Sequence, residues 1–304
     1  MWFKNLLLYR LTKPTQWDAD ELEQQLEPFV FKPAGSQDIS KLGFVKPLGK
    51  VGDSLVHSAQ GNLLLAIEKE EKMLPAAVIR EELEQKVSLI EDEQGRKVTK
   101  KEKDSIKDEI IHTLLPRAFS RKSRTRALIL APLQLVLVEA TSHTKAEELL
   151  SLVRKAIGSL PIAPVSMTRL PEESMTEWVT RGHVGDGFTM LDEATLKSPL
   201  EDGGSVAVKQ MALNSDEVTA HIEQGLEVTK IALEYRDILS LVLGADLSVK
   251  RLKFSEEIRD QNSEFDKEEL AARLDADFAL MCGELTGFLP DLFAALGGVE
   301  QEKV

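Results

Sequence analysis

Residues 75–126 carry the sequence PAAVIREELEQKVSLIEDEQGRKVTKKEKDSIKDEIIHTLLPRAFSRKSRTR, and this stretch decides how the rest of the chain is organised. Its first half repeats apolar residues at helical spacing, with Pro75 suited to a first helical turn and Gly95 suited to a helix end. A second helix is expected from a Thr99 cap to the residue before Pro116. The stretch therefore predicts two consecutive helices that form a hairpin.

Segments of strand character lie on both sides of this hairpin. Before it, FKNLLLYRLT predicts a strand, and SLVHSAQGNLLLAIEKE predicts two strands around a turn at Gly61-Asn62. The segment QWDADELEQQLEPF between them predicts a helix with Thr15 as its N-cap. After the hairpin, ALILAP and LQLVLVEA return to strand character, and residues 144–157 form an amphipathic helix closed by Gly158. The hairpin is thus predicted to be an insertion.

The carboxyl-terminal part begins after the proline-marked segment SLPIAPVS. Four segments in it have strand composition, VAVKQMAL, LEVTKIALEY, DILSLVLG and LSVKRLKF, and SDEVTAHIEQG between the first two predicts a capped helix. The last helical stretch has apolar residues three and four apart on one face, where Pro290 is expected to break or kink it. Core packing is the favoured interpretation of this face, with a subunit interface as the alternative. The apolar positions are Leu270, Leu274, Phe278, Met281, Leu285, Phe288 and Leu292.

These patterns predict an α+β protein in which antiparallel sheets pack with helices. We expect a central α+β domain made of residues 1–74 and 127–168, and an inserted helical hairpin with a basic exit segment at residues 75–126. A carboxyl-terminal α+β domain is expected at residues 169–304.

Composition restricts the setting in which the protein works. The 304 residues are 42% hydrophobic, which is enough for a substantial core, but no run of about eighteen apolar residues occurs. The amino end lacks a signal-peptide pattern, so we expect a cytoplasmic protein without a membrane partner. The single cysteine, Cys282, can form neither an internal disulfide nor a metal site alone, and it is predicted to be a small buried hydrophobe.

Charge is strongly segregated along the chain. The formal net charge of −13 argues at first against a polyanionic partner. Residues 96–126, however, contain eleven Lys or Arg against four acids, so this window carries +7 and the remainder carries −20. Because electrostatic interactions are screened over about 8 Å at physiological salt, a bound phosphate responds mainly to the local charge.

The exit segment PRAFSRKSRTR contains basic residues and no acid. If it runs into the following strand, Lys122, Arg124 and Arg126 point to one side about 6.6 Å apart, a spacing that suits successive phosphates. Arginine also favours bidentate phosphate contacts. For the aromatic Phe119, packing is the favoured interpretation and base stacking the alternative. The candidate polyanion-binding residues are Arg117, Phe119, Arg121, Lys122, Arg124 and Arg126, joined by Lys97, Lys100 and Lys101 from the hairpin.

Within the second helix itself, Lys100, Lys103 and Lys107 share one face, but Asp104 and Asp108 stand beside them at pairing distance. A solvated, salt-bridged surface is therefore the favoured interpretation for that helix alone.

No motif for catalysis stands out. The segment GFVKPLGKV has one residue too many between its glycines for a phosphate-binding loop, and Val51 stands where a hydroxyl is needed. The five histidines lie at least 31 residues apart. Asp275 and Asp277 would point about 200° apart on a helix, so they cannot hold one ion together. We expect no catalytic residue, metal or cofactor, although a nuclease site assembled from distant acids stays open as an alternative.

The segment KEKDSIKDEIIHTLLPRAFSR resembles the RdgC family of recombination-associated proteins. Further stretches resemble that family in the same order: WFKNLLLYRLT, GSQDISKLGFVKPLG, EEKMLPAAVI, GSLPIAPVSM, MTEWV, LDEATLKSPLEDGG, KRLKFSEEIRDQN and DADFALMCGEL. The resemblance covers nearly the whole chain.

What the resemblance implies is a curved subunit that forms a ring-shaped homodimer with a hole wide enough for duplex DNA. It also implies sequence-nonspecific binding of single- and double-stranded DNA in the nucleoid, and modulation of recombination by limiting RecA-promoted strand exchange, with competition against the RecA filament. By motif, Arg117, Phe119, Lys209 and Gln210 fall on positions implicated in the family's contacts with DNA or within the ring. The alternative is a protein-interaction scaffold that acts on a recombinase through its acidic exterior.

Overall fold

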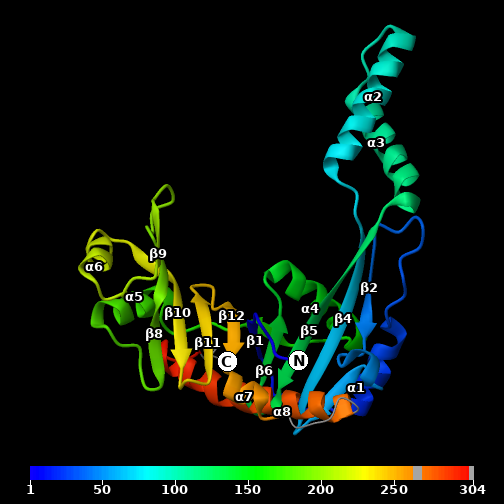
Figure 1. Ribbon diagram of the computed structural model, residues 1–304. Coiled ribbons are helices and arrows are strands. Elements are labelled where there is room, and N and C mark those ends of the chain that lie inside the picture. Colours follow the sequence, from blue (N-terminus) through cyan, green and yellow to red (C-terminus); the bar gives the residue numbers. More distant parts are fainter. Residues whose placement is uncertain (263–268, 301–304) are drawn as a thin grey trace. The chain divides into compact units, whose positions relative to one another are not determined.

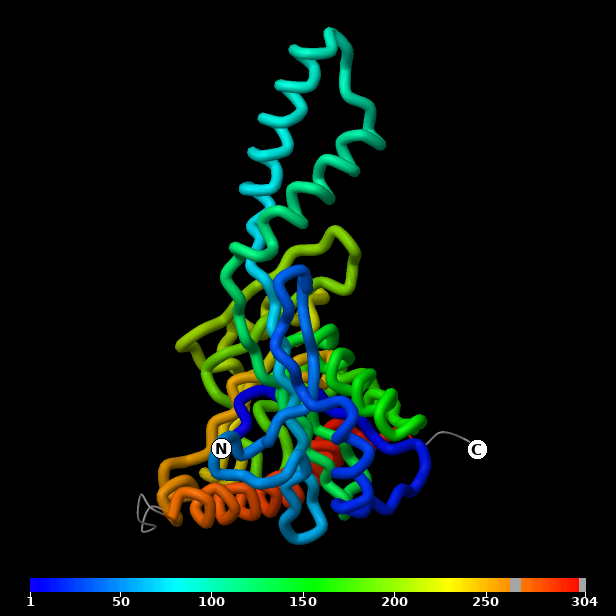
Figure 2. Tube along the Cα trace, turned by 90° about the vertical axis from the view of Figure 1, so that its right-hand side faces the viewer, coloured from blue at the N-terminus to red at the C-terminus, as the bar shows by residue number. Residues whose placement is uncertain are grey.

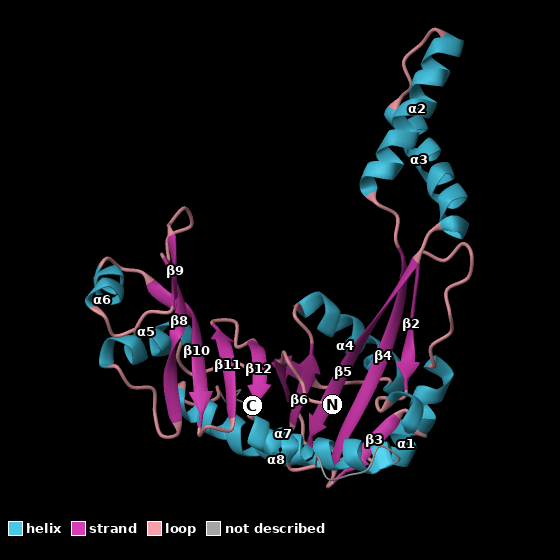
Figure 3. Cartoon of the chain, in the orientation of Figure 1, coloured by secondary structure: helices cyan, strands magenta, loops and turns pink. Residues whose placement is uncertain are grey.

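The computed structural model describes residues 1–262 and 269–300 of the chain (Figure 1). The described part is α+β, as predicted, with two antiparallel sheets and eight α-helices (Figure 3). It divides into two compact units. Unit 1 contains residues 1–26, 46–66 and 125–304, and unit 2 contains residues 27–45 and 67–124.

The first sheet has seven strands in the order β2-β4-β5-β6-β1-β7, with β3 paired to β4. Alternation of apolar residues produces its long strands: Leu128 and Leu130 of β5 face the same core as Leu135 and Leu137 of β6. The strands are β1 (Leu7–Leu11), β2 (Ser40–Val45), β3 (Val56–Ala59), β4 (Asn62–Lys72), β5 (Ser120–Leu130), β6 (Leu135–Glu139) and β7 (Ile162–Pro164).

The predicted hairpin between β3 and β4 is confirmed, but its turn lies one residue earlier than expected. Ala59 pairs with Asn62, so the two-residue loop is Gln60-Gly61, and both loop residues have positive φ, 52° and 78°. Two positive φ values match the right-handed twist of a hairpin. Asn62 already belongs to β4 and is buried.

The second sheet lies entirely in unit 1 and has the order β12-β11-β10-β8-β9. Four of its strands, β9 (Ser205–Lys209), β10 (Glu227–Tyr235), β11 (Leu239–Gly244) and β12 (Val249–Phe254), confirm the strand predictions. The strand β8 (Phe188–Lys197) was not predicted. It carries the acids Asp192 and Glu193 in its middle, which hide the apolar alternation of a strand.

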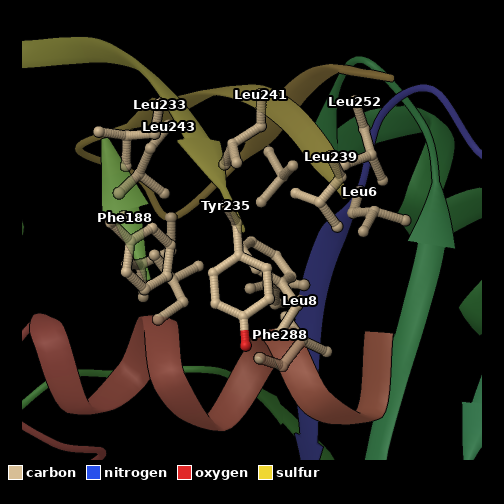
Figure 4. Packing of buried hydrophobic residues seen from close by; sticks show 14 of the residues in the cluster. Leu6, Leu8, Phe188, Leu233, Tyr235, Leu239, Leu241, Leu243, Leu252 and Phe288 are labelled. Carbon is tan, nitrogen blue, oxygen red and sulfur yellow. The ribbon is translucent and has the colours of Figure 1, made fainter. Parts of the chain in front are cut away.

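The carboxyl-terminal helix α8 (Leu270–Ala295) packs against one face of the second sheet (Figures 1 and 4). Phe278, Met281, Leu285, Phe288 and Leu292 are completely buried, which confirms the core interpretation for these five positions. Leu274 is only partly buried, and for Leu270, which is 44% exposed, the core interpretation was wrong. By length and composition alone α8 could cross a membrane, which is weak evidence because a core helix passes the same test.

Two predictions about α8 have different outcomes. Cys282 is buried as expected, and this burial raises the pKa of its thiol to about 12. Of the two outcomes predicted at Pro290, a break or a kink, the break does not occur, because α8 continues to Ala295. Burial of Phe288, Leu289 and Leu292 around the exposed proline holds the last turns against the loss of one backbone hydrogen bond.

The other helices of unit 1 range from the five residues of α7 to the fifteen residues of α4. Helix α1 starts at Ala19, and Asp18 accepts the Glu21 amide at 2.8 Å, so Asp18 caps it and the prediction of Thr15 as its N-cap was wrong. Helix α4 ends before Gly158, as predicted. The elements are α1 (Ala19–Leu26), α4 (His143–Ile157), α5 (Pro171–Arg181), α6 (Asp216–Glu223) and α7 (Glu256–Asp260).

Unit 2 contains the predicted helical hairpin, which Figure 2 shows as two helices joined by a short loop. Helix α2 (Ala76–Gln94) ends at Gly95, whose φ of 64° is left-handed, and α3 (Lys100–Leu114) follows. The Thr99 cap is confirmed as a full capping box with Glu102. No residue of α2 is buried, whereas Ile110 of α3 is buried, and Leu83, Val87 and Ile90 of α2 are half-buried.

The aromatic packing under the second sheet supports a stability prediction. Phe288 is fully buried, with ring centroids 5.4 Å from Tyr235 and 6.1 Å from Phe188. We expect Phe288→Ala to lower the free energy of unfolding by about 3–5 kcal/mol, because it removes buried area and leaves a cavity. Phe119→Ala is the control, because the Phe119 ring is 80% exposed. This substitution should change the free energy of unfolding by less than about 0.5 kcal/mol. Urea denaturation measures the free energy of unfolding of both variants. Equal effects of the two substitutions would contradict the placement of Phe288 in the core.

The cap of α3 supports a prediction about pH. The Arg96 side chain, followed by the Thr99 backbone and hydroxyl, hydrogen-bonds the Glu102 carboxylate and lowers its pKa from 4.5 to about 2. A lowered folded-state pKa stabilises the cap above about pH 4.5, and this contribution is lost as the pH falls towards about 2. Protection of the first α3 amides against hydrogen exchange should fall over that pH range. In the Arg96→Ala variant this protection should be lost at a higher pH. An NMR titration midpoint of Glu102 near its ordinary value would contradict this assignment.

Candidate functional site

The acid-free exit segment begins in unit 2 with a short 3-10 helix, η3 (Leu115–Arg117), and continues into β5. Leu115 is buried and anchors the segment, while Arg117 and Arg121 are exposed. Within residues 1–262 and 269–300, neither arginine forms an ion pair with an acid. Phe119 between them is 80% exposed, although packing was the favoured interpretation of this ring.

The backbone of this segment is held in place by β4 and the residue that follows it. The Met73 amide donates to the Phe119 carbonyl at 2.8 Å, and the Lys72 ammonium donates to the Ala118 carbonyl at 3.4 Å. Hydrogen bonds to two successive carbonyls, those of Ala118 and Phe119, therefore fix the backbone that presents the Phe119 ring to solvent.

The next cations of β5 are neutralised by an acid that is distant in sequence. Glu68 of β4 lies 3.2 Å from the Lys122 ammonium and 3.4 Å from an Arg124 guanidinium nitrogen. The Lys122 ammonium also lies 4.8 Å from the centre of the Phe31 ring. The strand β5 is continuous from Ser120 to Leu130, so the predicted strand geometry at Lys122, Arg124 and Arg126 is present. Lys122 and Arg124, however, share the carboxylate of Glu68.

A second carboxylate on β4 organises the same part of unit 2. Glu70 is buried and accepts the Ala34 amide at 3.0 Å. This bond, the Ser120 hydroxyl and the ammonium groups of Lys122 and Lys72 lower the pKa of Glu70. Glu70 therefore stays ionised and contributes negative charge beside Lys122.

Arg126 belongs to unit 1 and has its own partners. Its guanidinium lies 3.0 Å from the Glu139 carboxylate and donates to the Met1 carbonyl at 3.3 Å. Burial raises the pKa of Glu139, and Arg126 opposes that shift. Only 26% of the Arg126 side chain is exposed. Arg126 therefore forms a structural ion pair with Glu139 and is not a free cation.

The lysines of the hairpin are solvated. Lys97, Lys100 and Lys101 are exposed, and in the described residues none of their ammonium groups has an acidic partner. The pairs that do form are Arg96 with Glu102 at 2.6 Å and Lys86 of α2 with Glu109 at 3.0 Å. The expected pairs of α3 lysines with Asp104 and Asp108 do not occur in this part of the chain.

Lys209 and Gln210 line a groove of about 700 Å³ on the second sheet, in unit 1. Both are exposed, and Gln210 has a left-handed φ of 53° directly after β9. Two further cations, Arg251 and Lys253 of β12, line the same groove, together with the acids Asp192 and Glu193 of β8.

Arg251 and Lys253 were not among the functional candidates predicted from the sequence. The segment VKRLKF of β12 does carry a signal, because Val249, Leu252 and Phe254 are buried and the three remaining residues are cations. This pattern predicts a strand with one basic face, provided that the strand contains a bulge.

The two aspartates of α8 act separately, as expected from their spacing. Asp275 lies 3.1 Å from the His57 ring nitrogen, and buried Asp277 accepts the Asn262 amide at 3.0 Å. Among the residues that the structure describes, no group of three or more His, Cys, Asp or Glu side chains is arranged to hold a metal ion.

Fold and surface define an α+β protein with two antiparallel sheets, an inserted helical hairpin and two exposed cationic regions. The chain belongs to the RdgC family, since the sequence model of that family, described as "Putative exonuclease, RdgC", matches residues 1–299.

Curated relatives named "Recombination-associated protein RdgC" agree with this membership. The relative from Shewanella oneidensis is 56% identical and that from Aeromonas hydrophila 54% identical, each over 301 residues and 99% of both chains. The relative from Shewanella baltica is 54% identical over 304 residues and the full length of both chains. The protein is therefore a recombination-associated member of this family.

Proposed function

We propose that the protein binds single- and double-stranded DNA without sequence preference and thereby modulates homologous recombination. The observation that carries this proposal is the pair Arg117 and Arg121, exposed and without an acidic partner in the described residues, on either side of a ring that is 80% exposed. Free guanidinium groups bind phosphates of any sequence, and an exposed ring can stack on any base.

The acidic majority of the chain does not oppose this function. The −20 carried outside residues 96–126 is spread over 273 residues, whereas the free arginines act within a few ångströms of a phosphate. A protein that is anionic elsewhere stays soluble and is repelled by nucleic acid at other surfaces. Charge segregation therefore directs DNA to particular surfaces.

The finer part of the proposal concerns assembly and biological role. Two copies form a ring-shaped homodimer that encloses duplex DNA, and occupation of DNA limits RecA-promoted strand exchange by competition with the RecA filament. A closed ring needs only modest phosphate contacts, because topology keeps it on the DNA. The protein works in the cytoplasm on the nucleoid, without a membrane partner, cofactor or catalytic step. Slow dissociation from covalently closed circles and fast dissociation from linear DNA, after a salt challenge, is the result that encirclement requires.

The free arginines support a quantitative prediction. Log affinity should fall linearly with log salt, with a slope of about −0.9 for each phosphate neutralised. The double substitution Arg117→Ala, Arg121→Ala should reduce the magnitude of this slope by about 1.8 for each subunit that contacts the DNA, because each subunit loses two phosphate contacts. Fluorescence anisotropy with two duplexes of equal length and unrelated sequence measures the slope and the sequence preference together.

The matched control for this experiment is the pair Arg169→Ala, Arg181→Ala. Arg169 precedes α5, and Arg181 is the last residue of this helix. Each pairs with an acid, Arg169 with Glu173 at 3.1 Å and Arg181 with Glu177. The control removes the same charge but should leave the slope unchanged. Equal slopes for the unmodified protein and the Arg117/Arg121 variant would remove the exit segment from the interface.

The family description makes a nuclease the second candidate function. Such an enzyme would act with a divalent cation on DNA ends. We expect linear DNA to keep its length after prolonged incubation with the protein and Mg²⁺ or Mn²⁺, as measured by gel electrophoresis of end-labelled strands. Progressive shortening that disappears with a chelator would replace the binding proposal with an enzymatic one.

The third candidate, a scaffold that binds a recombinase, has support in the acids of α2. Glu81, Glu82, Glu84, Asp92 and Glu93 are all exposed on this helix. Pull-down of purified RecA without DNA, lost when these acids are changed to the corresponding amides, is the result that would favour direct contact over competition for DNA.

A further inference from the structure

The second sheet of unit 1 has one apolar face and one charged face. On β12, Val249, Leu252 and Phe254 are buried in the core that contains α8, whereas Arg251 and Lys253 are exposed on the opposite face. Strict alternation would direct Lys250 and Arg251 to opposite faces. An irregularity in the strand changes this.

That irregularity is a bulge at Arg251. Ser240 of β11 pairs with Lys253, and Val242 pairs with Lys250, so Leu241 alone faces two residues of β12. Arg251 occupies the extra position with a left-handed φ of 52°. Its amide donates to the Asn5 side chain at 3.4 Å, and the Leu252 amide donates to the Lys4 carbonyl at 2.8 Å. The bulge therefore has its own backbone partners and places a guanidinium in the groove.

A second irregularity lies across the groove, in β8. Ile231 of β10 pairs with Ala194 and Leu233 pairs with Met190, so Ala232 faces the three residues 191–193. All three of these residues line the groove. Glu193 at the end of this segment pairs directly with Lys209 of β9. The two bulges thus direct an acid and a base towards each other over the small side chain of Ala232.

The acid and the base meet in an ion pair. The Glu193 carboxylate lies 2.7 Å from the Arg251 guanidinium, with the two side chains 34% and 59% exposed. Lys209 and Lys253 line the same groove, and no acid lies within ion-pair distance of either in the part of the chain that the structure describes. The groove therefore contains three cations, of which one is held by Glu193.

We propose that Arg251, together with Lys209 and Lys253, forms a subsite for a phosphodiester of the DNA backbone, and that Glu193 occupies Arg251 until a phosphate replaces it. This subsite rests on the proposed function, because it assigns one place where a bound strand is held. The three cations line one groove on a single face of one small sheet, and the occupant with complementary charge and no need for base recognition is a phosphodiester.

Glu193 has a defined effect in this arrangement. It keeps the guanidinium oriented across the groove while no DNA is bound, and it competes with the phosphate for the same nitrogen atoms. Loss of the carboxylate therefore frees Arg251 and should strengthen DNA binding. A partly exposed pair is worth little in water, so the expected gain in affinity is up to about fivefold.

The experiment is a double-mutant cycle with the full-length protein and duplex DNA. Arg251→Ala should weaken binding and reduce the magnitude of the salt slope by about 0.9, the contribution of one phosphate. Glu193→Gln should tighten binding, and this gain should vanish in the Arg251→Ala background. Circular dichroism and thermal unfolding check that each variant is folded.

The matched control is Glu234→Gln. Glu234 pairs with Ser240 in the register of β10 and β11, so it lies on the charged face, and in the described residues no cation forms an ion pair with it. The control removes the same charge as Glu193→Gln but frees no cation. It should therefore leave the affinity for DNA unchanged in both backgrounds. Equal tightening by Glu193→Gln and Glu234→Gln, persisting without Arg251, would show a general charge effect and overturn the role of Glu193.

The outcomes separate the subsite from the proposed function. DNA binding that responds to Arg117→Ala, Arg121→Ala but not to Arg251→Ala would overturn the subsite alone. A protein that binds no DNA would overturn both.

Discussion

Burial of α8 against the second sheet is the interaction on which unit 1 depends. An antiparallel sheet needs one covered face, and the apolar stripe of α8 covers β8 to β12 with Phe278, Met281, Leu285, Phe288 and Leu292. Tyr235 is buried in the same core, and its hydroxyl donates to Asp291 of α8 at 2.6 Å. Because one face is committed to the core, the other is free to carry charge, and the groove of Lys209, Arg251 and Lys253 lies there.

Tertiary structure decides which cations are free. Arg117, Arg121, Lys122 and Arg124 look equivalent in an acid-free stretch, yet Glu68 on the neighbouring strand neutralises the last two. Such exposed pairs contribute little to stability, but they change the charge that a polyanion meets. In the second sheet, Glu193 has the same relation to Arg251. The charge offered to a ligand is set by cross-strand neighbours more than by sequence neighbours.

Irregularities of the sheets shape the groove. A regular β12 would place Lys250 on the face opposite to Arg251 and Lys253, and a regular β8 would direct Asp192 and Glu193 to opposite faces. The bulges bring basic and acidic side chains onto one face at the cost of a left-handed arginine. The positive φ of Gln210 after β9 continues this irregular rim.

The sequence by itself determined the local elements, because their signals are local. Periodicity predicted the hairpin and the buried face of α8, Thr99 and Gly95 predicted helix ends, and β-branched and apolar runs predicted four strands of the second sheet. Where two local signals competed, as at Thr15 and Asp18, capping geometry decided the outcome against the prediction. The candidate cations of the exit segment were also found from sequence. Only the tertiary structure decided that Glu68 pairs with two of them, that β8 is a strand, and that Arg251 shares a groove with Lys209. These facts depend on strand pairing and on bulges, which join residues far apart in the chain and leave no periodic signal.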